Sequence, residues 1–437
     1  MSIVNDHDTT NTNGRCQTTL ISALSNPSIY ATSTLVLTAL GSATTLIAPT
    51  LLTASQFAAF ILLASFFQLA SRLDFGLSEL ADRYGARDRN WQTTTSNIMK
   101  LRWLIALICL PFIFLIALIN TRTNSLISNA DLALALSGGL LAMIAVGPVT
   151  LYRAQNRIKD FAGLALILQL GMTVPRLIGI AFGGTTGCYL ALFFWYVIFA
   201  SRSLRDARPF VFNIRETLTP LREASPLFLC ALLWLSFQFT PRWISALISS
   251  HNDFSFLAFA FSLMALATGT LTTIGQAYYP RYIALARNNR NETLQTALSR
   301  DGLKLIALSF MALCIILPLI PYGLQRFYPR YTPALSDTFL MMVSLFPFVP
   351  MLWFMPFVLS VTKFPLRLMS ALTLPTSAVL SLLMSVFYQS IGREGQSFAI
   401  LISIFLTLFI FSFALFVEKL VTKSRAFMFL GLIGVLT

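Results

Sequence analysis

Residues Thr53–Asn90 read TASQFAAFILLASFFQLASRLDFGLSELADRYGARDRN. The apolar run Phe57–Leu73 is long enough to cross the hydrocarbon core of a bilayer as a helix. It is followed directly by a segment rich in acidic and basic residues, in which Leu77 and Leu80 keep a near-helical spacing. A hydrophobic span that leaves the bilayer into a charged cytoplasmic helix has this pattern.

The composition of the whole chain extends this interpretation. Of the 437 residues, 56% are hydrophobic and only 11% are charged, and the mean hydropathy is +0.73. Soluble domains carry roughly a quarter charged residues, so the composition predicts an all-α polytopic membrane protein. The net charge of +14 comes from basic residues between apolar runs. We interpret them as topology determinants and contacts to anionic membrane lipids, and not as a nucleic-acid surface.

Twelve apolar runs are long enough to span about 30 Å of hydrocarbon. The predicted spans are Ile29–Leu52, Phe57–Leu73, Trp103–Ile119, Leu132–Tyr152, Phe161–Phe182, Thr185–Ala200, Pro226–Ile248, Phe254–Tyr278, Leu303–Tyr322, Thr338–Val361, Leu366–Tyr388 and Phe398–Val417.

The basic residues between these spans predict the orientation of the chain. With the N-terminus inside, 25 of the 31 lysines and arginines lie on the cytoplasmic side and only Arg122, Arg326, Arg330 and Arg393 lie outside. Positively charged connections mark the cytoplasmic side of a membrane protein. We therefore expect an even number of spans, with both termini cytoplasmic.

The two halves of the chain resemble one another. Ser55-Gln-Phe57 opens the second span and Asn252-Asp-Phe254 opens the eighth, and Ala86–Asn90 matches Ala286–Arg290 with nearly the same offset. Both matched segments run from outside to inside, which predicts a parallel pseudo-repeat. The expected organisation is a cytoplasmic tail (1–28), an N-lobe of spans 1–6 (29–200), a cytoplasmic basic linker (201–225), a C-lobe of spans 7–12 (226–417) and a C-terminal tail (418–437). The linker suits either a helix in the membrane interface or a plain basic connection.

Known signatures of catalysis, nucleotide binding and metal binding do not occur in the sequence. The five cysteines form no CxxC pair or Cys/His cluster, and there is no Walker A loop or HExxH motif. We therefore assign no catalytic residue, cofactor or metal ligand.

Two arginines stand out because they lie inside apolar runs, Arg176 beside Pro175 and Arg242 beside Pro241. A guanidinium within a span is costly and normally faces a cavity or a partner, although an arginine in the outer half of a span can also extend to the headgroups. Two such cations lining one chamber would attract a diphosphate, which suits the planar fork of arginine. Gln68 and Gln238 are candidate contacts to sugar hydroxyls, with interhelical hydrogen bonding as the alternative.

Asp74 follows the second span directly, in Leu73-Asp-Phe-Gly-Leu-Ser-Glu79. We predict that it pairs with Arg72, or with a basic group of another connection, as a cytoplasmic gate. Capping of a helix at the interface is the alternative role.

The chain resembles the polysaccharide-transporter branch of the multidrug/oligosaccharidyl-lipid/polysaccharide exporter superfamily, in particular the O-antigen flippases. The resemblance rests on Leu51-Leu-Thr-Ala-Ser-Gln-Phe57 and Leu73-Asp-Phe-Gly-Leu-Ser-Glu79, and the twelve-span plan extends it over nearly the whole chain. It implies a transporter, and not an enzyme, that moves an undecaprenyl-diphosphate-linked oligosaccharide from the cytoplasmic to the periplasmic leaflet of a bacterial inner membrane. A cationic central cavity is expected in that family, and Arg176 and Arg242 match it by location.

Other partners and functions follow from the same resemblance. A coupling ion and polysaccharide-assembly proteins are further partners that such a flippase would use, and no nucleic acid is expected. A cation or drug antiporter of the same superfamily is the main alternative, but it would place acidic residues inside the spans. A membrane-embedded polymerase or glycosyltransferase is the second alternative, and it would need a larger outward loop than Tyr322–Asp337.

Overall fold

The computed structural model describes residues 27–78, 80, 91–120, 126–154, 158–203, 214–287, 291–361 and 365–417. The two terminal tails, most of the charged segment that follows the second span and residues 204–213 of the basic linker lie outside this part of the chain. So do residues 86–90 and 288–290 of the expected match between the two halves, and what the sequence indicates for these residues stays a prediction.

The described chain is built from helices. They are α2 (Pro27–Leu51), α3 (Ala54–Ser71), α5 (Trp91–Asn120), α6 (Asn129–Ala145), α7 (Gly147–Ala154), α8 (Ile158–Ser203), α9 (Ile214–Ile248), α10 (His251–Arg287), α11 (Asn291–Phe327), the short 3-10 helix η1 (Pro329–Ala334), α12 (Leu335–Val361), α13 (Pro365–Ile391) and α14 (Arg393–Val417). A spanning segment has no water to satisfy its backbone, so these apolar sequences fold into helices that pair their own amides and carbonyls.

Helix α8 contains two of the predicted spans. Its backbone leaves helical geometry at Gly183 and Gly184, and Gly184 has a φ of 58°, which glycine adopts without strain. Ten segments of the described chain are long and apolar enough to cross a membrane, and the one at Gly163–Ser203 is divided by this break. The break divides this segment into two, and the shorter apolar part of α2 (Ala39–Leu51) lies at the first of the twelve predicted spans, so the described helices follow the predicted order.

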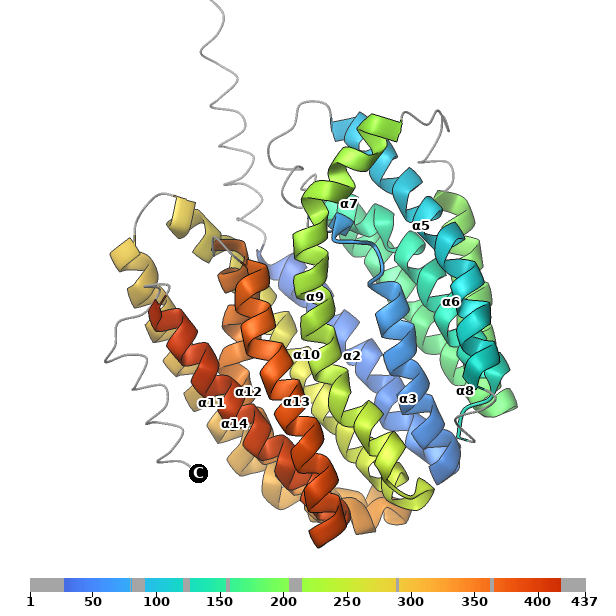
Figure 1. Ribbon diagram of the computed structural model, residues 1–437, viewed down its shortest axis with the longest axis vertical. Coiled ribbons are helices and arrows are strands. Elements are labelled where there is room, and N and C mark those ends of the chain that lie inside the picture. The colour runs from blue at the N-terminus through green and yellow to red at the C-terminus, as the bar shows by residue number, and fades with distance from the viewer. Residues whose placement is uncertain are drawn as a thin grey trace, which may run out of the picture.

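The spans form two lobes. In Figure 1 helices α2–α8 lie on one side, α11–α14 lie on the other, and α9 and α10 stand between them. Contacts within each lobe follow the same pattern. The second and fourth spans pack together (α3 with α6, α10 with α12), as do the first and fifth (α2 with α8, α9 with α13) and the fourth and sixth (α6 with α8, α12 with α14). The two lobes are thus related by the parallel pseudo-repeat that the sequence predicts.

The starts of α3 and α10 confirm the register of this repeat. Thr53 caps α3 by accepting a hydrogen bond from the Gln56 amide, and Ser250 caps α10 by accepting one from the Asp253 amide. Such caps satisfy amides that the first turn of a helix leaves free. The offset that aligns Ser55 with Asn252 also pairs Thr53 with Ser250 and Gln56 with Asp253.

The structure describes residues at both ends of the predicted basic linker (201–225), and these residues belong to the helices on either side of it. Residues 201–203 complete α8, and residues 214–225 form the first turns of α9 without a break from its span. The interfacial helix proposed for 201–225 is therefore not a separate element in residues 214–225.

Candidate functional site

The two lobes meet along α3, which packs against α9 and α10. We call this contact the lobe seam. Near the start of α3, Phe57 packs against Phe259 of α10 at a ring-centroid distance of 6.4 Å. Midway, the Trp243 indole of α9 donates a hydrogen bond of 2.9 Å to the Ser65 hydroxyl. At the other end, Phe75 and Phe228 lie 4.5 Å apart. Helix α3 thus contacts the C-lobe along its whole length.

Arg176 lies inside the N-lobe, beside this seam. Its guanidinium covers the ring of Phe60 on α3 at 4.6 Å and interacts with Cys188 and Tyr189 of the second leg of α8. Tyr189 in turn donates a hydrogen bond of 3.0 Å to the Phe60 carbonyl. The Arg176 Nε is buried and has no hydrogen-bond partner in the described structure. A guanidinium whose N–H groups are not all used can still bind an anion.

Arg242 lies inside the C-lobe. Its guanidinium is 5.4 Å from the ring of Phe239 and 6.0 Å from that of Phe261, and its Nε is also buried without a partner among the described residues. Arg242 directly precedes Trp243, the residue that bonds Ser65 across the seam. Both guanidinium groups therefore pack on aromatic rings.

The two arginines lie at a similar distance from the ends of their helical legs. Arg176 stands two helical turns before the Gly183–Gly184 break of α8, and Arg242 stands two turns before the Ser249–Ser250 connection that ends α9. With a rise of about 1.5 Å per residue, each lies roughly 10 Å from its turn. No ion pair to a carboxylate is formed by either arginine within the described residues.

One carboxylate lies near the Arg176 cluster without pairing with it. Asp131, in the first turn of α6, is buried and interacts electrostatically with Cys188 and Tyr189. Its Oδ1 has no hydrogen-bond partner in the described structure. Asp131 and Arg176 are on different helices and far apart along the chain, so their proximity could not be predicted from the sequence.

The two glutamines predicted for the site lie on the seam helices. Gln68 is exposed on α3, one turn beyond Ser65 and therefore on the face that meets α9. Gln238 is half-buried on α9, one turn before Arg242 and on the same face of that helix. Gln68, Gln238 and Arg242 thus belong to the two helices that the Ser65–Trp243 hydrogen bond joins, whereas Arg176 packs on Phe60, nearer the start of α3.

Asp74 is a buried ionic anchor at the far end of α3. Arg102 of α5 donates to Asp74 Oδ2 at 3.0 Å, to the Ser78 hydroxyl at 2.7 Å and to the Met143 carbonyl at 3.0 Å. Asp74 also accepts hydrogen bonds from the amides of Gly76 and Ser78. The partner of Asp74 is therefore a basic group of another element, whereas Arg72 is exposed.

This anchor sets the turn that reaches across the seam. Phe75 and Gly76 have φ values of 53° and 79°, a left-handed conformation that costs energy for phenylalanine. The turn places Phe75 on Phe228, and a Cβ on Gly76 would lie 2.6 Å from the Ala224 carbonyl oxygen. Residues Leu73–Ser78 of the sequence motif thus form a contact between the lobes, which a motif alone does not reveal.

Comparison with known proteins supports the fold. No family model matches the chain, and no curated protein matches it. Among solved structures, the lipid II flippase MurJ in an inward closed conformation matches with a TM-score of 0.68 and 14% identity, over 93% of this chain and 91% of that chain. An inward-facing multidrug resistance MATE family transporter of the MOP superfamily matches with a TM-score of 0.61 and 15% identity, over 95% of this chain and 98% of that chain.

A third structure comes from Pyrococcus furiosus. It is a MOP superfamily transporter described by the reverse polarity of its binding pocket, and it matches with a TM-score of 0.54 and 14% identity, over 95% of this chain and 96% of that chain. At these identities the likeness establishes the fold, which is that of the MOP superfamily transporters.

Proposed function

We propose that this protein is a flippase that moves an undecaprenyl-diphosphate-linked oligosaccharide from the cytoplasmic to the periplasmic leaflet. The observation that carries the proposal is the pair of half-buried arginines, one in each lobe, whose Nε atoms are buried without a hydrogen-bond partner in the described structure. Neither has a carboxylate partner among the described residues. Placing a guanidinium within a span costs about 2.5–3.5 kcal/mol on insertion scales, and such residues usually serve a function.

The chemistry of the two arginines suits a diphosphate. Guanidinium groups form charge-assisted, bidentate hydrogen bonds with phosphate oxygens. Packing on Phe60 and Phe239 holds each group in place, and the Nε of each has no hydrogen-bond partner in the described structure. In the proposed cycle the lobes separate along the seam, and a diphosphate then binds between Arg176 and Arg242. Gln68 and Gln238 would contact the first sugars, and the polyprenyl chain would stay in the lipid.

The turn at Asp74 is our candidate for the cytoplasmic gate. It holds Phe75 against Phe228 on the side predicted to be cytoplasmic. Opening of that side requires this contact to break, while the Asp74–Arg102 pair keeps the turn itself intact. Arg72, which is exposed beside the turn, would take part only through its charge at the cavity entrance. We place the protein in the bacterial inner membrane with both termini cytoplasmic.

A drug or cation antiporter has the same fold, and MATE transporters match this chain as well. A cationic substrate needs carboxylates within the spans. Asp131 and Asp253 lie in the first turns of α6 and α10, and Asp74 lies in the turn that follows α3. The charge of the site therefore favours an anionic substrate over the antiporter, and over a polymerase or glycosyltransferase that would need catalytic groups.

Complementation tests the proposal. The native chain and the variants Arg176→Ala, Arg242→Ala and Arg326→Ala are expressed at matched membrane levels in strains that lack their own oligosaccharide flippase. Arg326 is the matched control, because it is an exposed arginine on the predicted periplasmic side. We expect surface glycan to return with the native chain and with Arg326→Ala, and to be lost with the other two variants.

Two other outcomes would change the proposal. Rescue by all four chains would retain the flippase but remove Arg176 and Arg242 from its anion site. Resistance to cationic drugs without any surface glycan would identify the antiporter instead.

A further inference from the structure

The connection between α11 and α12 lies across the lobe seam. We call residues Tyr328–Ala334 the strap; they consist of Tyr328 and the 3-10 helix η1. Pro329 and Pro333 fix two of its φ angles. Its internal hydrogen bonds join the Tyr331 amide to the Tyr328 carbonyl at 2.8 Å and the Thr332 hydroxyl to the Pro329 carbonyl at 2.8 Å. The strap is therefore a rigid element and not a loose loop.

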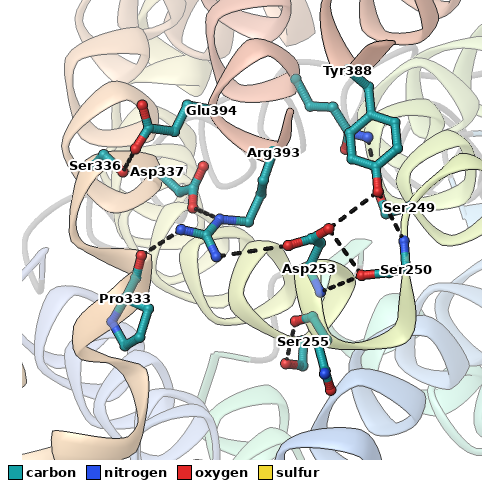
Figure 2. A network of polar contacts seen from close by, with 12 residues as sticks. Ser249, Ser250, Asp253, Ser255, Pro333, Ser336, Asp337, Tyr388, Arg393 and Glu394 are labelled. Carbon is teal, nitrogen blue, oxygen red and sulfur yellow. Dashed lines mark hydrogen bonds and ion pairs between the residues drawn. The ribbon is translucent and has the colours of Figure 1, made fainter. Parts of the chain in front are cut away.

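Arg393 anchors the strap to the C-lobe, as Figure 2 shows. Arg393, at the start of α14, donates to the Pro333 carbonyl of the strap and forms an ion pair with Asp337 of α12. Its guanidinium also lies 4.0 Å from a carboxylate oxygen of Asp253. Asp337 is fully buried and accepts a further hydrogen bond of 2.8 Å from the Ser397 hydroxyl.

Neighbouring contacts tie four helices of the C-lobe to this anchor. The Asp253 carboxylate accepts hydrogen bonds from Ser250 at 2.9 Å and from Tyr388 of α13 at 3.1 Å. Ser336 donates to Glu394 at 2.6 Å. The strap therefore moves with the starts of α10, α12 and α14 and the end of α13 as one body.

The other face of the strap contacts the N-lobe. The Tyr328 hydroxyl donates to the Leu46 carbonyl at 2.8 Å, and Arg330 donates to the Leu52 carbonyl at 2.8 Å. Carbonyls at the C-terminal end of a helix such as α2 lack intrahelical donors and favour a cation. Burial raises the pKa of Tyr328, so its hydroxyl keeps its proton and remains a donor at high pH.

Tyr331 is the centre of this contact. Its ring stacks on Phe259 at 4.5 Å and meets the edge of Phe57 on α3 at 5.7 Å. Tyr331 and Ala334 belong to the same buried apolar cluster as Leu52 and Phe57 of the N-lobe. The Tyr331 hydroxyl is buried there with no hydrogen-bond partner among the described residues. An unsatisfied buried hydroxyl destabilises the state that buries it.

We infer that the strap is the latch of the predicted periplasmic gate, held in place by Arg393 and destabilised by the Tyr331 hydroxyl. The strap is anchored rigidly on the C-lobe and makes a mostly apolar contact with the N-lobe. It can therefore separate from the N-lobe as an intact element when the seam opens. Opening also exposes the Tyr331 hydroxyl to water. The hydroxyl is unsatisfied only in the closed state, and it therefore limits the stability of that state. The inference rests on the proposed transport cycle but not on the identity of its substrate.

Accessibility of a cysteine at Ala334 tests this inference. Ala334 is fully buried, and the change Ala334→Cys is made in the full chain after its five native cysteines have been replaced. Intact cells are treated with a membrane-impermeant thiol reagent, and the labelling rate is measured alone and with Arg393→Ala, Tyr331→Phe or Arg326→Ala. Gel filtration of the purified proteins checks that each variant is folded.

The two informative variants should change the labelling rate in opposite directions. Arg393→Ala leaves Asp337 buried without its partner, and we expect labelling to become at least about tenfold faster. Tyr331→Phe removes the unsatisfied hydroxyl, and we expect labelling to become about 5–150-fold slower. Arg326→Ala should leave the rate unchanged. Misfolding accelerates labelling, so the slower rate of Tyr331→Phe distinguishes a latch from general loosening.

Equal labelling rates in Tyr331→Phe and in the chain with native Tyr331 would overturn the inference. So would an unchanged rate in a folded Arg393→Ala variant. Labelling needs no substrate, and the two proposals can therefore fail separately. The expected labelling pattern in a chain that restores no surface glycan would retain the latch and reject the flippase.

Discussion

Replacement of Asp74 should destabilise the protein more than replacement of its ionic partner Arg102. Arg102 is 2% exposed, and it forms an ion pair of 3.0 Å with Asp74. Asp74→Ala would remove this carboxylate from a buried guanidinium that also donates to Ser78 and to the Met143 carbonyl. Removing one partner of a buried ion pair costs about 3–5 kcal/mol.

Replacement of Arg102 instead of Asp74 leaves a buried charge that keeps more of its hydrogen bonds. In Arg102→Met the Asp74 carboxylate still accepts hydrogen bonds from the Gly76 amide and from the amide and hydroxyl of Ser78. The unfolding free energy then falls by about 1–3 kcal/mol, because the buried Met143 carbonyl and one oxygen of the Asp74 carboxylate each lose a hydrogen bond. The double variant should lose less than the sum of the two single variants, because no buried charge is left unpaired.

Chemical unfolding of the purified protein in mixed micelles, followed by tryptophan fluorescence, measures these differences. Arg72→Met is the matched control, because Arg72 is exposed beside the same turn, and it should change the unfolding free energy by less than about 0.5 kcal/mol. A cost for Arg102→Met equal to or above that for Asp74→Ala would refute the reasoning. Additive costs in the double variant would refute it too.

Three further variants probe close contacts between helices. Gly179→Ala should lower the melting temperature, because its Cβ would lie 2.3 Å from a backbone oxygen of the other leg of α8, whereas Gly163→Ala meets no atom within 4 Å and should not lower it. Trp243→Phe should cost about 1 kcal/mol in unfolding free energy by removing the hydrogen bond to Ser65. Gly76→Ala combines a φ of 79° with a clash at the seam, and circular dichroism during heating should show a larger loss than for Trp243→Phe.

The arrangement of spans was predictable from the sequence because a bilayer imposes it. Apolar length and the side on which arginines accumulate specify twelve helices and their order, and even the break at Gly183–Gly184 falls between the predicted spans Phe161–Phe182 and Thr185–Ala200. The repeat was also predictable, because both lobes begin their second span with the same capping pattern. These features depend on local sequence and on the surrounding lipid.

The partners of the charged residues were not predictable, because they depend on how each helix is rotated about its axis. Asp74 has several basic residues within reach along the sequence, and only the packing of α5 against α6 selects Arg102. The strap has the composition of an ordinary outward connection, and Arg393 reaches it from the start of α14. The sequence predicted arginines inside the spans but not the aromatic rings that hold them.

The hairpin in α8 has a consequence for how the chain enters the membrane. Its two legs are joined by Gly183 and Gly184 with no polar loop, and Gly179 and Gly187 touch just below the join. The first leg therefore has no hydrophilic segment that could rest outside while the second leg is still being synthesised. We expect the two legs to partition into lipid together as a preformed hairpin. A charged tag inserted between Gly183 and Gly184 would then block biogenesis rather than transport.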